Sequence, residues 1–217
     1  MLFRSLPYTD ELWGWARGAK DLIGITDGPW KVDLCLTTTG PKLIELTARL
    51  SGGFHCQFCS RAAHGTNEIR ATAAWACQIP FNARWLIHQR SQGAAVRAAF
   101  PAPGRVKRID TSRAKQCHGV QDVVVLCQEG DLIGPYRNSA DRVAFVMVSA
   151  DTTQQAIQWA DYAAGCVEIE TEPICPICEK AMQVSRQSVD EPETRDCECG
   201  LHWTGFHPRS VLMEERF

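Results

Sequence analysis

The sequence has no apolar run of the about 18 residues that a membrane-spanning helix needs. Its opening segment, Met1–Pro7, lacks the apolar stretch of a secretory signal. Two common phosphate-binding glycine motifs, Gly-x-x-x-x-Gly-Lys and Gly-x-Gly-x-x-Gly, are also missing. The formal net charge is −2, so the composition gives no indication of binding to nucleic acid or to an anionic membrane. These absences favour a cytoplasmic protein without a membrane or nucleic-acid partner.

Cysteine, in contrast, is abundant, because the 217 residues include eleven. In a secreted protein an odd number would leave one thiol unpaired. Without an export signal, reduced thiols and metal ligands are favoured over disulfides. The hydrophobic share of 45% and the charged share of 22% are typical of globular proteins. The length predicts between one and two domains of usual size.

Two acidic residues on neighbouring strand-like runs form the main candidate site. The runs are Trp30–Thr38 and Lys42–Arg49, and the turn between them is predicted at Thr39-Gly40-Pro41. A hairpin centred on Thr39 places Asp33 directly across from Glu45. Facing like charges destabilise a strand pair, whereas a Mg²⁺ ion shared by both carboxylates would stabilise it. The alternative is a surface hairpin with two solvated acids. Side-chain alternation predicts that Glu45 shares its face with Leu43, Thr47 and Arg49.

The residues around this pair resemble a known family. Gly24–Asp33 and Gly40–Gly53 are similar to the metal-binding end of the ATP-grasp ligases, most of all to the branch that contains the L-amino-acid ligases. The resemblance covers most of residues 10–170. It continues through a helix predicted over 66–77, with Thr66 as its N-cap, and through segment 94–170. The matching stretches in that segment are Gly130–Pro135, Ser139–Val143 and the helix after Asp151.

The resemblance implies a role for each residue of the motif. Asp33 and Glu45 match the two acidic positions that hold the Mg²⁺ ions bridging the phosphates of ATP. Arg49 matches the arginine that meets the phosphate or the carboxylate substrate. The backbone at Gly52-Gly53 can approach the substrate closely, since glycine has no Cβ. Thr47 stands where many members carry an Asn as a further metal ligand, and a threonine hydroxyl is a weaker ligand.

The family chemistry would join a small carboxylate to an amine through an acyl phosphate, with ATP as the phosphate donor. In these enzymes the lysines and the glycine-rich loop that hold ATP normally precede the stretch seen here. We therefore expect the chain to be the C-terminal part of a ligase that needs an ATP-binding half, for instance from a partner chain. The alternative is a non-catalytic zinc-ribbon adaptor on a degenerate ATP-grasp scaffold.

The predicted fold is α+β with three parts. Residues 1–93 form a partial ATP-grasp metal-binding subdomain with an antiparallel sheet and helices, and 94–171 form a small α+β domain. The second part contains strand-like runs at Val120–Cys127 and Arg142–Ser149. A capping box at Thr152–Gln155 opens a helix whose buried stripe is Ala156, Trp159, Ala160 and Ala163. The third part, 172–217, is a zinc ribbon.

The ribbon prediction rests on the spacing of four cysteines. Eighteen residues separate Cys175-Pro-Ile-Cys178 from Cys197-Glu-Cys199, and four thiolates on two tight turns provide a tetrahedral Zn²⁺ site. The second pair has one intervening residue instead of two, so His202 could replace one of its members. Residues 171–217 hold five Lys/Arg against nine Asp/Glu. This acidic balance favours a structural or protein-docking role over nucleic-acid binding.

A second cysteine pair, Cys56-Gln-Phe-Cys59, lies near His55 and His64. These residues could form another metal site, or the two thiols could be a redox pair. The interpretation we favour is that they line or pack beside the substrate pocket that the family resemblance implies.

Overall fold

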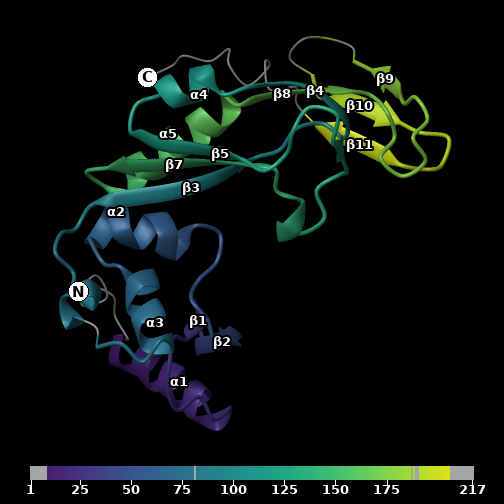
Figure 1. Cartoon of the computed structure of the whole chain (residues 1–217). Helices are drawn as coiled ribbons and strands as arrows, with labels where there is room; N and C mark the ends of the chain where they lie inside the picture. The colour runs from purple at the N-terminus through teal and green to yellow at the C-terminus, as the bar shows by residue number, and fades with distance from the viewer. Residues whose placement is uncertain (1–8, 81, 187, 189–190, 206–217) are drawn as a thin grey trace. The chain divides into compact units, whose positions relative to one another are not determined.

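The computed structural model of the chain describes residues 9–80, 82–186, 188 and 191–205. The chain divides into two compact units, Met1–Gln92 and Gly93–Phe217 (Figure 1). Both combine helices with antiparallel sheets, so the fold class is α+β as the sequence predicts. None of the helices in the described residues has the length and apolar character needed to cross a bilayer.

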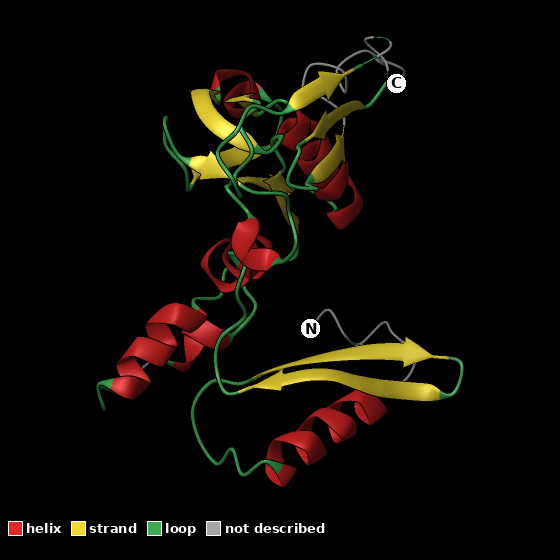
Figure 2. Cartoon of the chain, turned by 90° about the vertical axis from the view of Figure 1, so that its right-hand side faces the viewer, coloured by secondary structure: helices red, strands yellow, loops and turns green. Residues whose placement is uncertain are grey.

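The first unit is built from one strand pair and several short helices. Figure 2 shows α1 beside the hairpin of β1 and β2, and α1 contacts both strands. Its elements are α1 (Thr9–Leu22), β1 (Lys31–Thr37), β2 (Gly40–Thr47), the π-helix η2 (His55–Cys59), α2 (Ser60–His64), α3 (Glu68–Ala76) and the 3₁₀ helix η3 (Ala83–Leu86).

The hairpin pairs Asp33 with Glu45 as predicted, but its turn and its register differ from the prediction. Thr37 pairs with Gly40, so the turn consists of Thr38 and Thr39, and the prediction of a turn at Thr39–Pro41 was wrong. A β-bulge then shifts the register between Asp33 and Leu34. Because the bulge adds one residue to β2, Asp33 faces Glu45 after all.

Because of the same bulge, the face predicted for Leu43 was wrong. Leu43 pairs with Leu34, which is the residue after Asp33 in β1 and therefore points to the opposite face. Leu43 thus lies on the face opposite Glu45, although unbroken alternation along β2 placed both on one face. Pairs Lys31–Thr47 and Asp33–Glu45 lie on one common face of the hairpin.

The second unit contains three antiparallel three-stranded sheets, with strand orders β3-β7-β5, β6-β4-β8 and β11-β10-β9. The strands are β3 (Gly93–Ala99), β4 (Gly104–Asp110), β5 (Val120–Val125), β6 (Leu132–Ile133), β7 (Ala144–Ala150), β8 (Glu168–Glu172), β9 (Gln183–Ser185), β10 (Glu193–Asp196) and β11 (His202–Gly205). The helices are α4 (Ser112–Gln116), the 3₁₀ helix η4 (Ser139–Asp141) and α5 (Thr153–Gly165).

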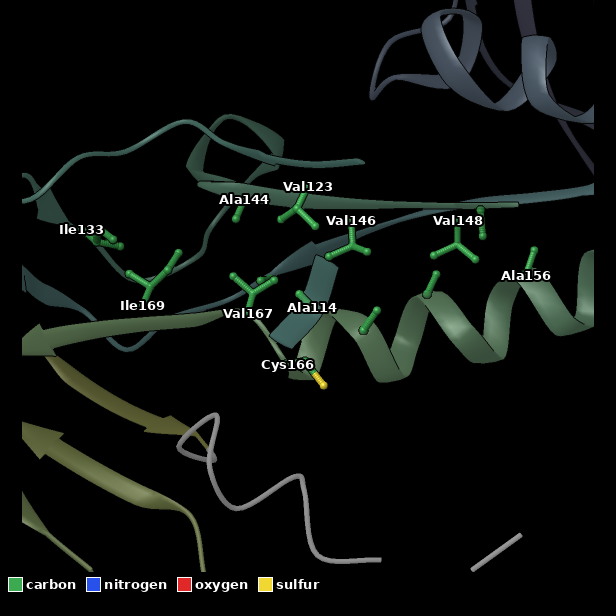
Figure 3. Close-up of a cluster of buried hydrophobic side chains, with 14 of the residues drawn as sticks. Ala114, Val123, Ile133, Ala144, Val146, Val148, Ala156, Cys166, Val167 and Ile169 are labelled. Atoms are coloured by element: carbon green, nitrogen blue, oxygen red, sulfur yellow. The ribbon is translucent and has the colours of Figure 1, made fainter. Parts of the chain in front are cut away.

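The core of this unit lies between β7 and α5. Figure 3 shows Val146 and Val148 directed toward the helix, where Ala156 faces them. Three alanines of the predicted stripe, at 156, 160 and 163, are fully buried, and such small side chains let a helix pack close to a sheet. The predicted capping box is confirmed, because Thr152 Oγ1 accepts from the Gln155 amide at 3.3 Å and Gln155 Oε1 accepts from the Thr152 amide at 3.2 Å.

Candidate functional site

The carboxylates of Asp33 and Glu45 face the same side of the hairpin, and a lysine contacts both. Lys31 Nζ binds Asp33 Oδ2 and lies 3.6 Å from Glu45 Oε1. Lys31 is two residues before Asp33 on the same strand, so its side chain lies over the same face. The hydrogen bond to Asp33 is the main cause that raises the pKa of Lys31. The repulsion expected between the two acids is therefore offset by an ammonium group of the chain itself.

Two more predicted residues lie beside this pair. Arg49 Nη2 is 3.6 Å from Glu45 Oε1, and its Nη1 donates to the carbonyl oxygen of Leu50 at 2.9 Å. Thr47 pairs with Lys31 in the register, and its Oγ1 is buried without a hydrogen-bond partner. A buried hydroxyl without a partner is unfavourable unless a ligand or water satisfies it.

Gly52 and Gly53 follow close to Arg49. A Cβ added at Gly52 would be 3.8 Å from Arg49 Nη1, so the first glycine lies next to the guanidinium. Gly53 has a φ of +63°, which a residue with a side chain rarely adopts. The structure thus brings Asp33, Glu45, Thr47, Arg49 and Gly52 into one neighbourhood. The carboxylate oxygens of Asp33 and Glu45 and the hydroxyl oxygen of Thr47 are the kind of ligand that Mg²⁺ prefers.

The four cysteines of the second unit form a compact cluster. The Sγ atoms of Cys175, Cys178, Cys197 and Cys199 all lie within 4.8 Å of one another. Cys175 is 3.5 Å from Cys199, and Cys178 is 3.3 Å from Cys197. Elsewhere in the described residues no other group of three or more His, Cys, Asp or Glu side chains is arranged to hold a metal.

Each pair of cysteines sits on a turn closed by backbone hydrogen bonds. The amide of Cys175 donates to Lys180 O, and the amide of Cys197 donates to Leu201 O. The shorter second pair is accommodated because Gly200 adopts a φ of +90°. His202 is not a ligand here, since its Nδ1 is 2.5 Å from Asp196 Oδ1 and its Nε2 is 2.9 Å from Thr204 Oγ1.

The thiols of the cluster influence one another. Burial acts to raise the pKa of Cys175, but backbone amides and the neighbouring thiols outweigh it and lower that pKa to about 6. The amide of Cys199 acts to lower the pKa of Cys197, but burial and the neighbouring thiols raise it to about 12. The cluster thus favours one thiolate, and it opposes the ionisation of a further thiol. A divalent cation would remove that opposition.

An arginine that the sequence analysis missed anchors the ribbon sheet to the preceding domain. Arg195 on β10 is only 5% exposed, and its guanidinium donates to Pro103 O at 2.8 Å, to Thr171 Oγ1 at 3.0 Å and to Glu193 Oε1 at 2.5 Å. It also lies 5.8 Å from the ring centroid of Trp203. The spacing of Glu193 and Arg195 on one face of a strand was the available signal, but two charged residues normally indicate a solvated face.

Cys56 and Cys59 do not belong to a ligand cluster in the part of the chain that the structure describes. Burial is the main cause that raises the pKa of both thiols, and a raised pKa opposes formation of the reactive thiolate. Nearby, the rings of His64 and His88 stack with centroids 4.3 Å apart. The interpretation that Cys56 and Cys59 line or pack beside the substrate pocket stays a prediction.

The sequence and the structure are similar to those of known ligases. Residues 97–172 match the family model of the L-amino acid ligase C-terminal domain 2, and the match ends at the last residue of β8. The L-amino acid ligase from Bacillus licheniformis superposes with a TM-score of 0.63 at 20% identity, over 74% of this chain and 40% of that chain. The chain therefore has a fold found in part of the ATP-grasp ligases.

Two further enzymes with the ATP-grasp fold are similar. Phosphoribosylglycinamide synthetase from Anaerococcus prevotii has a TM-score of 0.60 at 19% identity, over 70% of this chain and 39% of that chain. N5-carboxyaminoimidazole ribonucleotide synthetase from Thermotoga maritima has a TM-score of 0.55 at 15% identity, over 76% and 43%. This chain therefore spans about two fifths of the length of these enzymes. No curated protein matches the sequence.

Proposed function

We propose that the chain is the metal-binding and C-terminal part of an ATP-dependent carboxylate–amine ligase. The observation that carries the proposal is the direct pairing of Asp33 with Glu45 on one face of the hairpin, beside the unpartnered hydroxyl of Thr47. The match of residues 97–172 to an L-amino acid ligase domain supports the same class of reaction.

In this proposal the hairpin holds the metal and the phosphates. Asp33 and Glu45 would bind Mg²⁺, and Thr47 Oγ1 would be a further, weaker oxygen ligand. When bound, Mg²⁺ would neutralise charge on the phosphates of ATP. Arg49, which already lies beside Glu45, would neutralise the phosphate or the carboxylate substrate. Gly52 and Gly53 would bring backbone amides close to the same group.

A complete active site needs groups that the 217 residues do not provide. Neither of the two phosphate-binding glycine motifs occurs in the sequence. We propose that the ATP-binding half comes from a further segment or from a partner chain, and that the substrates are a small carboxylate and an amine.

The test is ADP formation with ATP, Mg²⁺ and mixtures of amino acids, by the full chain with an ATP-binding half supplied as a second chain. We expect turnover that Glu45→Ala abolishes and that Glu129→Ala, an exposed matched control, leaves unchanged. Turnover that survives Glu45→Ala would refute the role of the acid pair.

We also propose that Cys175, Cys178, Cys197 and Cys199 bind one structural Zn²⁺. The mutual proximity of the four sulfur atoms supports this. All eleven cysteines lie in the described residues and are free thiols, which supports a reducing, cytoplasmic location. We expect one zinc per chain by elemental analysis, with loss of zinc in Cys175→Ser and no loss in Cys35→Ser, an exposed cysteine of β1.

The cysteine cluster also favours a second candidate function, a non-catalytic adaptor that acts through its zinc ribbon. That function predicts partner binding that survives Glu45→Ala but not zinc removal, and no turnover with any ATP-binding half. Amide formation in the reconstituted assay would exclude it.

A further inference from the structure

The ammonium of Lys31 lies within ion-pair distance of both acids. It contacts Asp33 Oδ2 and is 3.6 Å from Glu45 Oε1. The Lys31 side chain is 23% exposed, whereas those of the two acids are 45% and 46% exposed. The Lys31 side chain as a whole is therefore the least exposed of the three.

The other cation near the acids is placed differently. Arg49 approaches Glu45 alone and directs its other nitrogen to the backbone of Leu50. Among the ion pairs of the described residues, Lys31 is the cation that joins Asp33 to Glu45. A divalent ion bound by the same two carboxylates would share them with the Lys31 ammonium, and its charge would repel an ammonium that stayed.

We propose that Lys31 competes with the divalent cation for Asp33 and Glu45. It neutralises the facing acids while no metal is bound, and it leaves them when a metal binds. The inference rests on the proposed function, because it assumes that the acid pair is the metal site. The affinity of the site for a free metal ion then depends on two quantities. These are the strength of the metal–ligand bonds and the free energy needed to move Lys31 away from the acids.

The test measures Mn²⁺ binding to the zinc-loaded full chain, with free Mn²⁺ counted by electron paramagnetic resonance. Lys31→Met removes the competing charge, so we expect about tenfold tighter Mn²⁺ binding at low salt. Lys31→Gln is a second neutral variant with the same expectation. Lys31→Arg keeps the charge and should stay within about twofold of the unmodified chain.

Lys42→Met is the matched control. Lys42 is exposed and pairs with Cys35, so it lies on the same face of the hairpin, nearer the turn. We expect its loss to change Mn²⁺ affinity by less than about twofold, because the acid pair lies farther away. Asp33→Asn with Glu45→Gln defines the background and should abolish the specific binding.

Competition by Lys31 and the metal site itself can fail separately in this experiment. If the unmodified chain binds Mn²⁺ and both neutral Lys31 variants bind it equally or more weakly, Lys31 is not a competitor and the metal site stands. A purely structural role for Lys31 gives that result, since a distorted hairpin weakens the site. If no form binds Mn²⁺, or if binding survives Asp33→Asn with Glu45→Gln, both the inference and the metal site fall.

Discussion

Asp33 and Glu45 offer oxygen ligands on a two-stranded hairpin, whereas the four cysteines lie on two turns of a sheet that Arg195 anchors to its neighbour. The acid pair is joined by a lysine of the chain. In the described residues, hydrogen bonds join the four thiols to one another and to the amide of Ile177.

The difference follows from the ordinary pKa values of the two kinds of ligand. Carboxylic acids in general are charged at neutral pH, so a facing pair needs a cation to offset its repulsion. Thiols in general keep their protons at neutral pH, so a metal-free cluster of four need not carry four charges. A hard-ligand site therefore needs a cation of the protein while it is empty, and a thiol site does not.

The largest effect is expected from removing zinc. Because four thiolates can be satisfied together only by a metal, a chelator should unfold the ribbon, and the loss should be on the order of 10 kcal/mol of metal-binding free energy. Loss of strand signal by circular dichroism, together with protease sensitivity within 173–205, measures it. A ribbon that remains folded without metal would show that the cluster is not a structural metal site.

Arg195→Ala should have the next largest effect. Removing the guanidinium leaves Glu193 buried without its partner, at a cost of about 3–5 kcal/mol in the free energy of unfolding. Urea unfolding measures the cost. The double variant Glu193→Leu with Arg195→Met removes both charges and should recover most of the stability. If the single variant costs less than about 1 kcal/mol, the ribbon is not anchored by this residue.

Lys31→Met should reduce the stability of the metal-free chain by less than about 1 kcal/mol, because the acids it neutralises are nearly half exposed. Saturating Mn²⁺ should restore the stability. Thermal unfolding with and without Mn²⁺ gives both values, with Lys42→Met as the control. An equal loss in the control would mean that net charge, and not the acid pair, is responsible.

The smallest effect is a salt dependence of that loss. Raising the salt from 0.1 M to 1 M shortens the screening length from about 10 Å to about 3 Å, so the destabilisation by Lys31→Met should fall by about half or more. The cost of Arg195→Ala should change little, because its partners are buried. Parallel unfolding curves at the two salt concentrations provide the measurement.

The sequence predicted which residues of the hairpin pair with each other better than it predicted the turn and the strand register that pair them. Asp33 faces Glu45 as expected, but a two-residue turn and a bulge produce the register together. A bulge has no reliable signature in one sequence, so the face of Leu43 was predicted wrongly. The N-cap predicted at Thr66 is at Asn67, whose side chain accepts from the Arg70 amide at 3.0 Å. Adjacent polar residues compete for that role on nearly equal terms.

Predictions from local sequence patterns were correct where a single constraint, such as cysteine spacing or helix periodicity, determines the structure. The cysteine spacing sufficed to bring four sulfur atoms together, since two tight turns leave few arrangements. The capping box and the alanine stripe of α5 were also correct, because helix periodicity and capping act within a few residues. Lys31 and Arg195 were missed, because a charged residue on a strand reveals its partner only after the strands are paired.

Anomalous diffraction from crystals of the zinc-loaded chain soaked in Mn²⁺ shows whether Asp33 and Glu45 form a metal site. We expect a manganese peak within bonding distance of carboxylate oxygens from both Asp33 and Glu45, with the Lys31 ammonium turned away from them. A map without that peak, with Lys31 still joining the two acids at saturating Mn²⁺, would show that the acid pair is not a metal site.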